Sequence, residues 1–201
     1  DDYILFFAHG PSNWNDDSKT FNNLYHDAVH YVLSYGGRQG KRVKIITSTE
    51  TILDPITSVE VTKHQEEDLT NIANMGRRWY GASFYGSSDR DYPFELTGRV
   101  EETAVEVTVA GAGVSDTSTR MKVIIGNVSE NVSFSPKQNL TRATLGNKMM
   151  SVTPNGEDLI LSINYESEGD NAAIAYLDYI KVVYARKLSG ALGQFGFQST
   201  H

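Results

Sequence analysis

Residues 103–110 read Thr-Ala-Val-Glu-Val-Thr-Val-Ala, with valine at every second position from Val105 to Val109. Successive side chains of a strand point to opposite faces, so this alternation predicts a half-buried β-strand whose valines face a core. The same period of two recurs in two other stretches, at Leu159, Leu161 and Ile163 and at Met121, Val123 and Ile125. Repeated short strands of this kind are typical of an antiparallel β-sandwich.

Turn residues separate the predicted strands. Gly111-Ala112-Gly113 and Gly146-Asn147 are predicted as turns, because glycine and asparagine favour turn conformations. The strands are predicted at residues 93–98, 103–110, 119–126, 139–145, 148–153, 158–165 and 174–184. Strands of this number and length fit a jelly roll.

The first part of the chain has a different pattern. Strands of a partial β subdomain are predicted at residues 3–8, 24–35 and 42–48. One short α-helix is predicted at residues 62–75, because acidic residues fill its first half and Gly76 suits its C-terminal cap. The predicted organisation is a partial N-terminal β subdomain at 1–60, a helix and junction at 61–80, a jelly-roll-like antiparallel β-sandwich at 81–188 and an exit linker at 189–201.

Composition excludes several classes of protein and site. The formal net charge of -7 opposes the basic footprint of a nucleic-acid-binding protein. The chain has no cysteine, which excludes thiolate metal sites and cysteine nucleophiles within it. No stretch reaches the roughly 20 apolar residues of a transmembrane helix. The strand-like start of the chain, without a signal peptide, is interpreted as a processing boundary of a longer protein.

No catalytic constellation is predicted. His9 precedes Gly10, but it has neither a cysteine partner nor a serine in a Gly-x-Ser-x-Gly elbow. His26 and His30 are four residues apart and lack a third ligand, so a metal site is less favoured than a structural role. We therefore expect that this chain is not an enzyme, and a small hydrolase is the least favoured hypothesis.

No cofactor is predicted, with a structural calcium ion left open. Acidic residues are numerous, and none of them forms an EF-hand loop. Those that could supply oxygen ligands to calcium in a sandwich are Asp116, Asp158, Glu166, Glu168 and Asp170.

The most distinctive cluster is residues 76–84, Gly-Arg-Arg-Trp-Tyr-Gly-Ala-Ser-Phe. Large aromatic residues at an element boundary usually bury, so a structural junction is favoured. The junction residues are Gly76, Arg78, Trp79, Tyr80, Gly81 and Phe84. The alternative is a sugar-stacking surface formed by Trp79, Tyr80 and Tyr92, which would make the chain a carbohydrate-binding jelly-roll module of a glycan-utilisation protein.

Four stretches, in this order, resemble the N-terminal non-peptidase region of the PorU family, the gingipain-related sortases of the Bacteroidetes type IX secretion system. The stretches are Phe-Phe-Ala-His-Gly-Pro-Ser-Asn-Trp at 6–14, Asn-Leu-Tyr-His-Asp-Ala-Val-His-Tyr-Val-Leu at 23–33, the segment from His64 through Gly76-Arg77-Arg78-Trp79-Tyr80-Gly81 to Phe84, and Ala-Tyr-Leu-Asp-Tyr-Ile at 175–180. Ala82 stands where that family often has Glu, and Tyr176 where it often has Trp.

The resemblance implies a cell-surface or outer-membrane setting and a cysteine peptidase domain downstream of this chain. The chain would then be a non-catalytic segment that acts as a scaffold or partner-binding module. Its partners would be the downstream peptidase domain and secretion-system proteins. The resemblance carries no catalytic residue over to this chain.

Overall fold

The computed structural model describes residues 10–11, 28–34, 36, 56–74, 78–138 and 141–189. The chain divides into two compact units, Asp1–Ile56 and Thr57–His201. In the first unit, residues 28–34 are exposed and form no strand, so the strand predicted at 24–35 is absent from its described part. An alternating pattern makes a strand only when a neighbouring strand pairs with it. The strands predicted at 3–8 and 42–48 lie outside the described residues.

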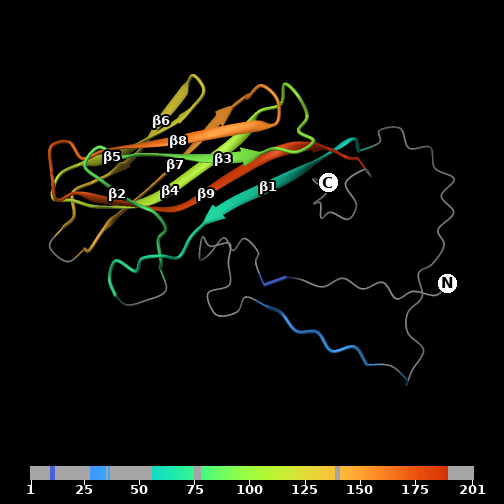
Figure 1. Ribbon diagram of the computed structural model, residues 1–201, viewed down its shortest axis with the longest axis horizontal. Helices are drawn as coiled ribbons and strands as arrows, with labels where there is room; N and C mark the ends of the chain where they lie inside the picture. The colour runs from blue at the N-terminus through green and yellow to red at the C-terminus, as the bar shows by residue number, and fades with distance from the viewer. Residues whose placement is uncertain are drawn as a thin grey trace. The chain divides into compact units, whose positions relative to one another are not determined.

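The second unit contains an antiparallel β-sandwich (Figure 1). One sheet has five strands, in the order β1-β9-β4-β7 with the short β2 also paired to β9, and the other has four, in the order β3-β8-β5-β6. The strands are β1 (Ser58–Glu66), β2 (Ser83–Tyr85), β3 (Asp89–Glu95), β4 (Val105–Val114), β5 (Thr119–Ile125), β6 (Val128–Phe134), β7 (Thr144–Val152), β8 (Asp158–Glu166) and β9 (Ile174–Lys187). The predicted fold class, a jelly-roll-like antiparallel sandwich, is confirmed.

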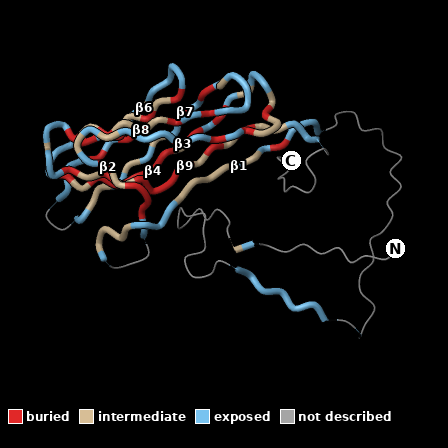
Figure 2. The backbone as a smooth tube through the Cα atoms, viewed as in Figure 1, coloured by how far each residue is buried: buried red, intermediate tan, exposed pale blue. Residues whose placement is uncertain are grey.

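The core lies between the two sheets and follows the predicted alternation. Val105, Val107 and Val109 of β4 are at most 1% exposed, and Leu161 and Ile163 of β8 are fully buried. Figure 2 shows buried residues concentrated along the strands of the sandwich, with exposed residues in the turns. Burying a side chain of this size contributes about 1.5–3 kcal/mol, so the valine and leucine faces hold the sheets together.

The predicted helix at 62–75 is wrong. Its first residues belong to β1, which pairs with β9 over the full length Ser58–Glu66. Val59 is buried and Val61 packs against the core, so the apolar face has the period of a strand. Pairing with β9 and this burial outweigh the weak helix preference of the charged residues that follow. Among the described residues no α-helix is present, and Gly76, the predicted cap, lies outside them.

The two predicted glycine turns are also wrong, because both lie inside strands. Gly111 and Gly113 belong to β4 and Gly146 to β7, so the strands predicted at 139–145 and 148–153 are one strand. A Cβ atom on Gly113 would lie 2.6 Å from Phe134 of β6, and one on Gly146 would lie 2.6 Å from the carbonyl oxygen of Ser133. These glycines therefore allow β6, which the sequence did not predict, to pack closely on β4 and β7.

The predicted domain limits at residues 60, 80 and 188 stay predictions. In the structure, β1 is an edge strand of the five-stranded sheet. Residues 190–201 of the predicted exit linker lie outside the described residues.

Candidate functional site

A β-bulge in β9 turns two neighbouring side chains toward the outer face of the five-stranded sheet. Ala110 of β4 pairs with Tyr179 while Gly111 pairs with Leu177, which leaves Asp178 as the extra residue. Leu177 and Ile180 both pack in the core, so the two residues between them face outward. A bulge of this kind re-aims side chains, and here it places an acid beside a tyrosine on the outer face.

The neighbouring edge of the sheet is interrupted at the same level. β1 ends with Glu66 opposite Tyr179, and β2 begins with Ser83 opposite Tyr176. Residues 67–74 leave the sheet after β1 and residues 78–82 return to it before β2, and we call these two described segments the 67–82 loop. The Gly81 N–H donates to the Leu177 carbonyl at 2.8 Å, and the Leu177 N–H donates to the Ala82 carbonyl at 2.9 Å.

The loop is closed on itself by backbone hydrogen bonds. Thr70 and Tyr80 exchange N–H to carbonyl bonds, each of 2.8 Å. At the base of the loop, a Cβ atom on Gly81 would lie 3.1 Å from the Glu67 carbonyl oxygen. Glycine at position 81 therefore lets the two ends of the loop lie side by side.

One ion pair ties the loop to the bulge. A guanidinium nitrogen of Arg78 donates to Asp178 Oδ2 at 2.7 Å, and the Asp178 side chain is only 5% exposed. The Arg78 guanidinium also lies over the Tyr80 ring, 5.7 Å from its centroid. Burial raises the pKa of Asp178, and the Arg78 hydrogen bond opposes this rise. The bond to Arg78 is what makes a buried carboxylate tolerable at this position.

Aromatic rings surround the pair. Tyr80 is buried, and its ring centroid lies 6.2 Å from that of Tyr176. Tyr179 stacks on His64 of β1, with centroids 5.4 Å apart. Burial and, to a smaller extent, the positive charge of Lys181 lower the pKa of His64 to about 4, so the imidazole is neutral at pH 7. Around the bulge, the described part of the outer face thus carries tyrosines, a neutral histidine and the Arg78–Asp178 ion pair.

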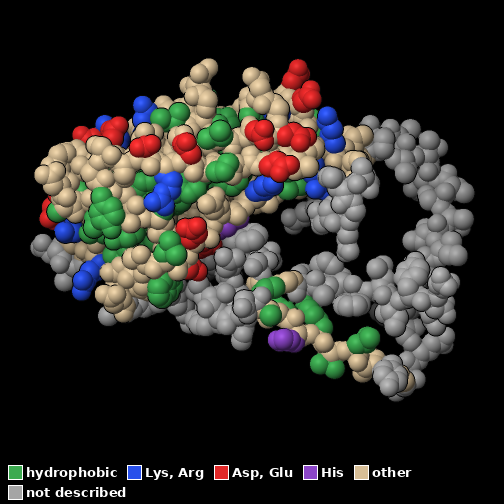
Figure 3. Space-filling model, in the orientation of Figure 1, with side chains coloured by type: hydrophobic (Ala, Val, Ile, Leu, Met, Phe, Trp, Pro, Cys, Tyr) green, Lys and Arg blue, Asp and Glu red, His purple; other side chains and the backbone are tan. Residues whose placement is uncertain are grey.

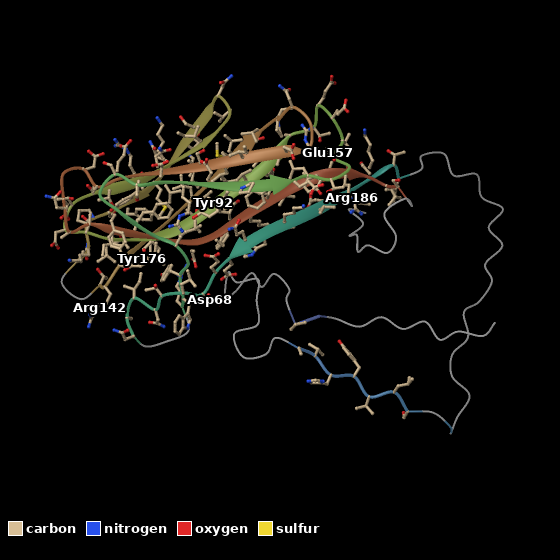
Figure 4. All side chains as sticks on the ribbon, viewed as in Figure 1. Asp68, Tyr92, Arg142, Glu157, Tyr176 and Arg186 are labelled. Carbon is tan, nitrogen blue, oxygen red and sulfur yellow. The ribbon has the colours of Figure 1, made fainter. Side chains whose placement is uncertain are left out.

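A groove runs between the 67–82 loop and the start of β7. Its volume is about 290 Å³, and it is lined mostly by apolar atoms. We call it the loop–β7 groove, and its lining residues are Ile72, Ala73, Arg78, Tyr80, Thr141, Arg142, Ala143 and Leu145. Figure 4 shows Arg142 and Tyr176 at the same end of the sandwich.

The junction residues predicted from the sequence come together only in part. Tyr80 and Phe84 are buried, and Gly81 provides the close approach at the base of the loop. Trp79 is 41% exposed, and Gly76 lies outside the described residues.

The predicted sugar-stacking surface does not assemble. Tyr92 is 5% exposed and belongs to β3, in the other sheet, where its side chain packs in the core. Tyr80 is equally buried, so Trp79 alone of the three offers an accessible ring. A ring in the core cannot stack on a ligand in this conformation.

Sequence reasoning did not single out Asp178, Arg142 or Leu145 as site residues. The signal for Asp178 was the stretch Leu177-Asp178-Tyr179-Ile180, in which an acid breaks the alternation of an otherwise apolar strand. Arg142 and Leu145 carry no local signal, because the groove is formed by segments about 70 residues apart in the chain.

Most of the acids considered for calcium have other partners. Asp170 accepts a hydrogen bond from Ser115 at 2.8 Å, and Arg120 pairs with both Glu166 and Glu168. Asp116 pairs with Lys137 at 3.3 Å, while Asp158 begins β8. Among the described residues, no group of three or more His, Cys, Asp or Glu side chains is arranged to hold a metal ion.

Within the described part of the chain, no helix has the length and apolar character needed to cross a membrane. The chain matches no known family model. It also matches no curated protein.

The sandwich is similar to a region of the crystal structure of dimeric latent PorU from Porphyromonas gingivalis. The TM-score is 0.55 at 17% sequence identity, and the match covers 66% of this chain and 13% of that chain. At this identity the likeness establishes the fold alone. The match spans a small part of PorU.

Two carbohydrate-binding modules give lower scores. A CBM36-1 domain of a multidomain xylanase from the hindgut metagenome of Trinervitermes trinervoides has a TM-score of 0.41 at 14% identity, covering 63% of this chain and 94% of that chain. A CBM36 module in complex with calcium and xylotriose has a TM-score of 0.39 at 18% identity, covering 63% of this chain and 99% of that chain. Scores this low carry no argument about this chain.

Proposed function

We propose that this chain is a non-catalytic β-sandwich module of a PorU-like sortase or peptidase of type IX secretion, at the cell surface or outer membrane. The observation that carries the proposal is the structural likeness to PorU, at a TM-score of 0.55 over 66% of this chain. The ordered motifs at residues 64–84 and 175–180 support it independently, because they meet at one place in the fold.

The module acts as a scaffold or partner-binding unit in this proposal. Its two sheets bury their apolar faces against each other, so the sandwich has a core of its own. The partners are a downstream peptidase domain of the same protein and, beyond it, proteins of the secretion system. The parent protein would cleave sorting signals from secreted cargo and attach the cargo to a surface anchor.

The gene that encodes the chain provides the first test. We expect the reading frame to continue past His201 into a peptidase domain with a catalytic His and Cys. A frame that stops near His201 would refute the proposal.

The second test measures the scaffold role in the parent protein. A parent with Gly113→Ala in the sandwich core is expected to lose cargo processing together with surface display. The peptidase assayed on a short soluble peptide should keep most of its activity. Equal loss of both activities would show that the sandwich is part of the catalytic machinery.

A carbohydrate-binding function is the second candidate, and the exposed ring of Trp79 is the observation that favours it. Binding to a glycan array, followed by calorimetry with each glycan that binds, tests this function. Binding that is lost in Trp79→Ala would support it. An absence of binding to all glycans would remove it.

A further inference from the structure

The loop–β7 groove has a chemical character that differs from the rest of the outer face. Its walls come from two segments, the 67–82 loop on one side and residues 141–145 on the other. Ile72 and Ala73 of the loop face Leu145 of β7 across it, and Leu145 remains 56% exposed. An apolar side chain left this open beside a hollow is surface that a partner can bury.

Arg142 adds a positive charge to the mostly apolar lining of the loop–β7 groove. Arg142 is exposed, and among the described residues no acidic side chain forms an ion pair with it. The second arginine in the lining, Arg78, is already neutralised by Asp178 at 2.7 Å. The groove therefore has one uncompensated guanidinium in a chain whose formal net charge is -7.

The apolar wall and the positive charge of Arg142 together favour some classes of ligand over others. A neutral sugar would need an accessible ring to stack on, and the one aromatic residue in the lining, Tyr80, is buried. A nucleic acid would be repelled by the net negative charge of the chain, and one exposed arginine is not the basic patch that such a ligand needs. A peptide that inserts an apolar side chain between Ile72 and Leu145 and places a carboxylate on Arg142 would satisfy both features, since guanidinium groups bind carboxylates with two parallel hydrogen bonds.

Figure 3 shows hydrophobic and basic side chains near each other at that end of the sandwich, and acidic side chains spread over much of the visible face. We propose that the loop–β7 groove binds a peptide segment of a partner protein in which an apolar residue is followed closely by an acidic one. This proposal deepens the proposed function, because it names the surface through which the module would bind a partner.

Selection from a displayed library of random dodecapeptides on the 201-residue chain tests the proposal. We expect enriched sequences to share an apolar residue within two positions of Asp or Glu. Each enriched peptide is then measured by fluorescence anisotropy on the chain and on single variants. Arg142→Gln removes the charge and Leu145→Ser removes the apolar wall, and each is expected to weaken binding about tenfold or more.

Two matched control variants keep the groove intact. Met149→Ser changes an exposed apolar residue of the same strand, and Lys122→Gln removes a positive charge from the other sheet. Both should bind the peptides as the unchanged chain does. Amide NMR shifts on peptide addition should fall at residues 72–73 and 141–145. Thermal unfolding shows that each variant is folded, because all four positions retain solvent exposure.

Three outcomes would overturn the proposal. The first is no enrichment, the second is enrichment without acidic residues, and the third is equal binding by the Arg142→Gln variant. Binding of an oligogalacturonate at the groove, with no peptide bound, would replace a peptide with an anionic glycan and would also refute it. If no peptide binds the groove but the gene encodes a peptidase domain, the proposed scaffold role is unaffected. If the gene lacks that domain, the PorU-like assignment is refuted, whatever binds the groove.

Discussion

Two regions of the sandwich achieve close packing by opposite means. Between the sheets, Gly111, Gly113 and Gly146 have no side chain, and Phe134 fills the space that they leave. On the outer face, the 67–82 loop is fixed by a charged pair, Arg78 with Asp178, and by the rings of Tyr80 and Tyr176. The contact between the glycines and Phe134 leaves no space for an added atom. The contact between the loop and β9 depends on Arg78, which neutralises the buried carboxylate of Asp178.

The difference indicates where the fold is fixed and where function can vary. Interior packing is dense, so the glycine contact defines a single arrangement of the two sheets. The loop is a local excursion that returns to the same edge of β9, and changes in it leave the two sheets paired as before. Four predictions test this contrast, and they run from the inner contact to the outermost ring.

Gly113→Ala is expected to have the largest effect. The new Cβ atom would lie 2.6 Å from both Cβ and Cγ of Phe134, so β4 or β6 must shift. Overpacking of this kind destabilises a protein by about 3 kcal/mol. Urea unfolding followed by circular dichroism measures the loss. An unchanged midpoint for Gly113→Ala would show that the sheets are not fixed here.

Arg78→Ala is expected to come second. It leaves the Asp178 carboxylate buried without its hydrogen-bond donor, which destabilises by about 2 kcal/mol, less than for a fully buried pair because Arg78 is half exposed. Asp178→Asn should cost less, since a neutral amide needs no counter-charge. The double variant should be more stable than Arg78→Ala alone. A double variant that loses the sum of both single effects would mean that the two residues are not coupled.

The pH dependence of stability reports on His64, at the other edge of the outer face. Its pKa is lowered to about 4 by burial, with Lys181 adding to the effect, against 6.5 for the free side chain. Between pH 6.5 and about 4 the unfolded chain therefore binds a proton that the folded chain does not. The stability that the neutral imidazole contributes is fully present above pH 6.5 and is lost as the pH falls to about 4. The shift corresponds to about 3 kcal/mol, and partial solvent exposure of the residue reduces the expected loss to about 2 kcal/mol.

His64→Gln is the control for this titration, because an amide does not take up a proton in this range. Desolvation raises the pKa values of the exposed Asp68 and the buried Asp178, so their protonation opposes the effect of His64 at the acid end. The difference between the two proteins, measured by urea unfolding at pH 7 and pH 4.5, isolates the histidine. Parallel pH profiles would contradict the lowered pKa.

The sequence predicted the sandwich because its alternating strands carry a local signal. β4, β5, β8 and β9 were predicted within a few residues of their observed limits, since valine, leucine and isoleucine at every second position have one interpretation. The second half of β1 was predicted as part of a helix because acids lie where a helix dipole favours them and Gly76 suits a helix cap, and the pairing of β1 with β9 is invisible to such local signals. Tertiary pairing overrides such weak preferences.

The glycines were misread for a related reason. Turn statistics treat Gly111, Gly113 and Gly146 as breaks, but in this fold they mark where Phe134 approaches the backbone. The candidate site was predicted in part: Tyr80, Gly81 and Phe84 lie at a junction, as their aromatic and glycine character indicated. Arg142 and Leu145 were missed because only the folded loop places them beside Ile72.

Trp79→Ala is expected to change stability least, by less than about 0.5 kcal/mol. Arg78 reaches the bulge and Tyr80 is buried, so the residue between them in this extended segment points away from the sheet, and Trp79 is 41% exposed. The same urea measurement that shows a loss in Arg78→Ala should show almost none here. A loss of more than about 1 kcal/mol would mean that the indole covers the ion pair. An unchanged stability leaves the ring free to contact a partner, so loss of glycan binding in this variant would reflect a lost contact and not a damaged fold.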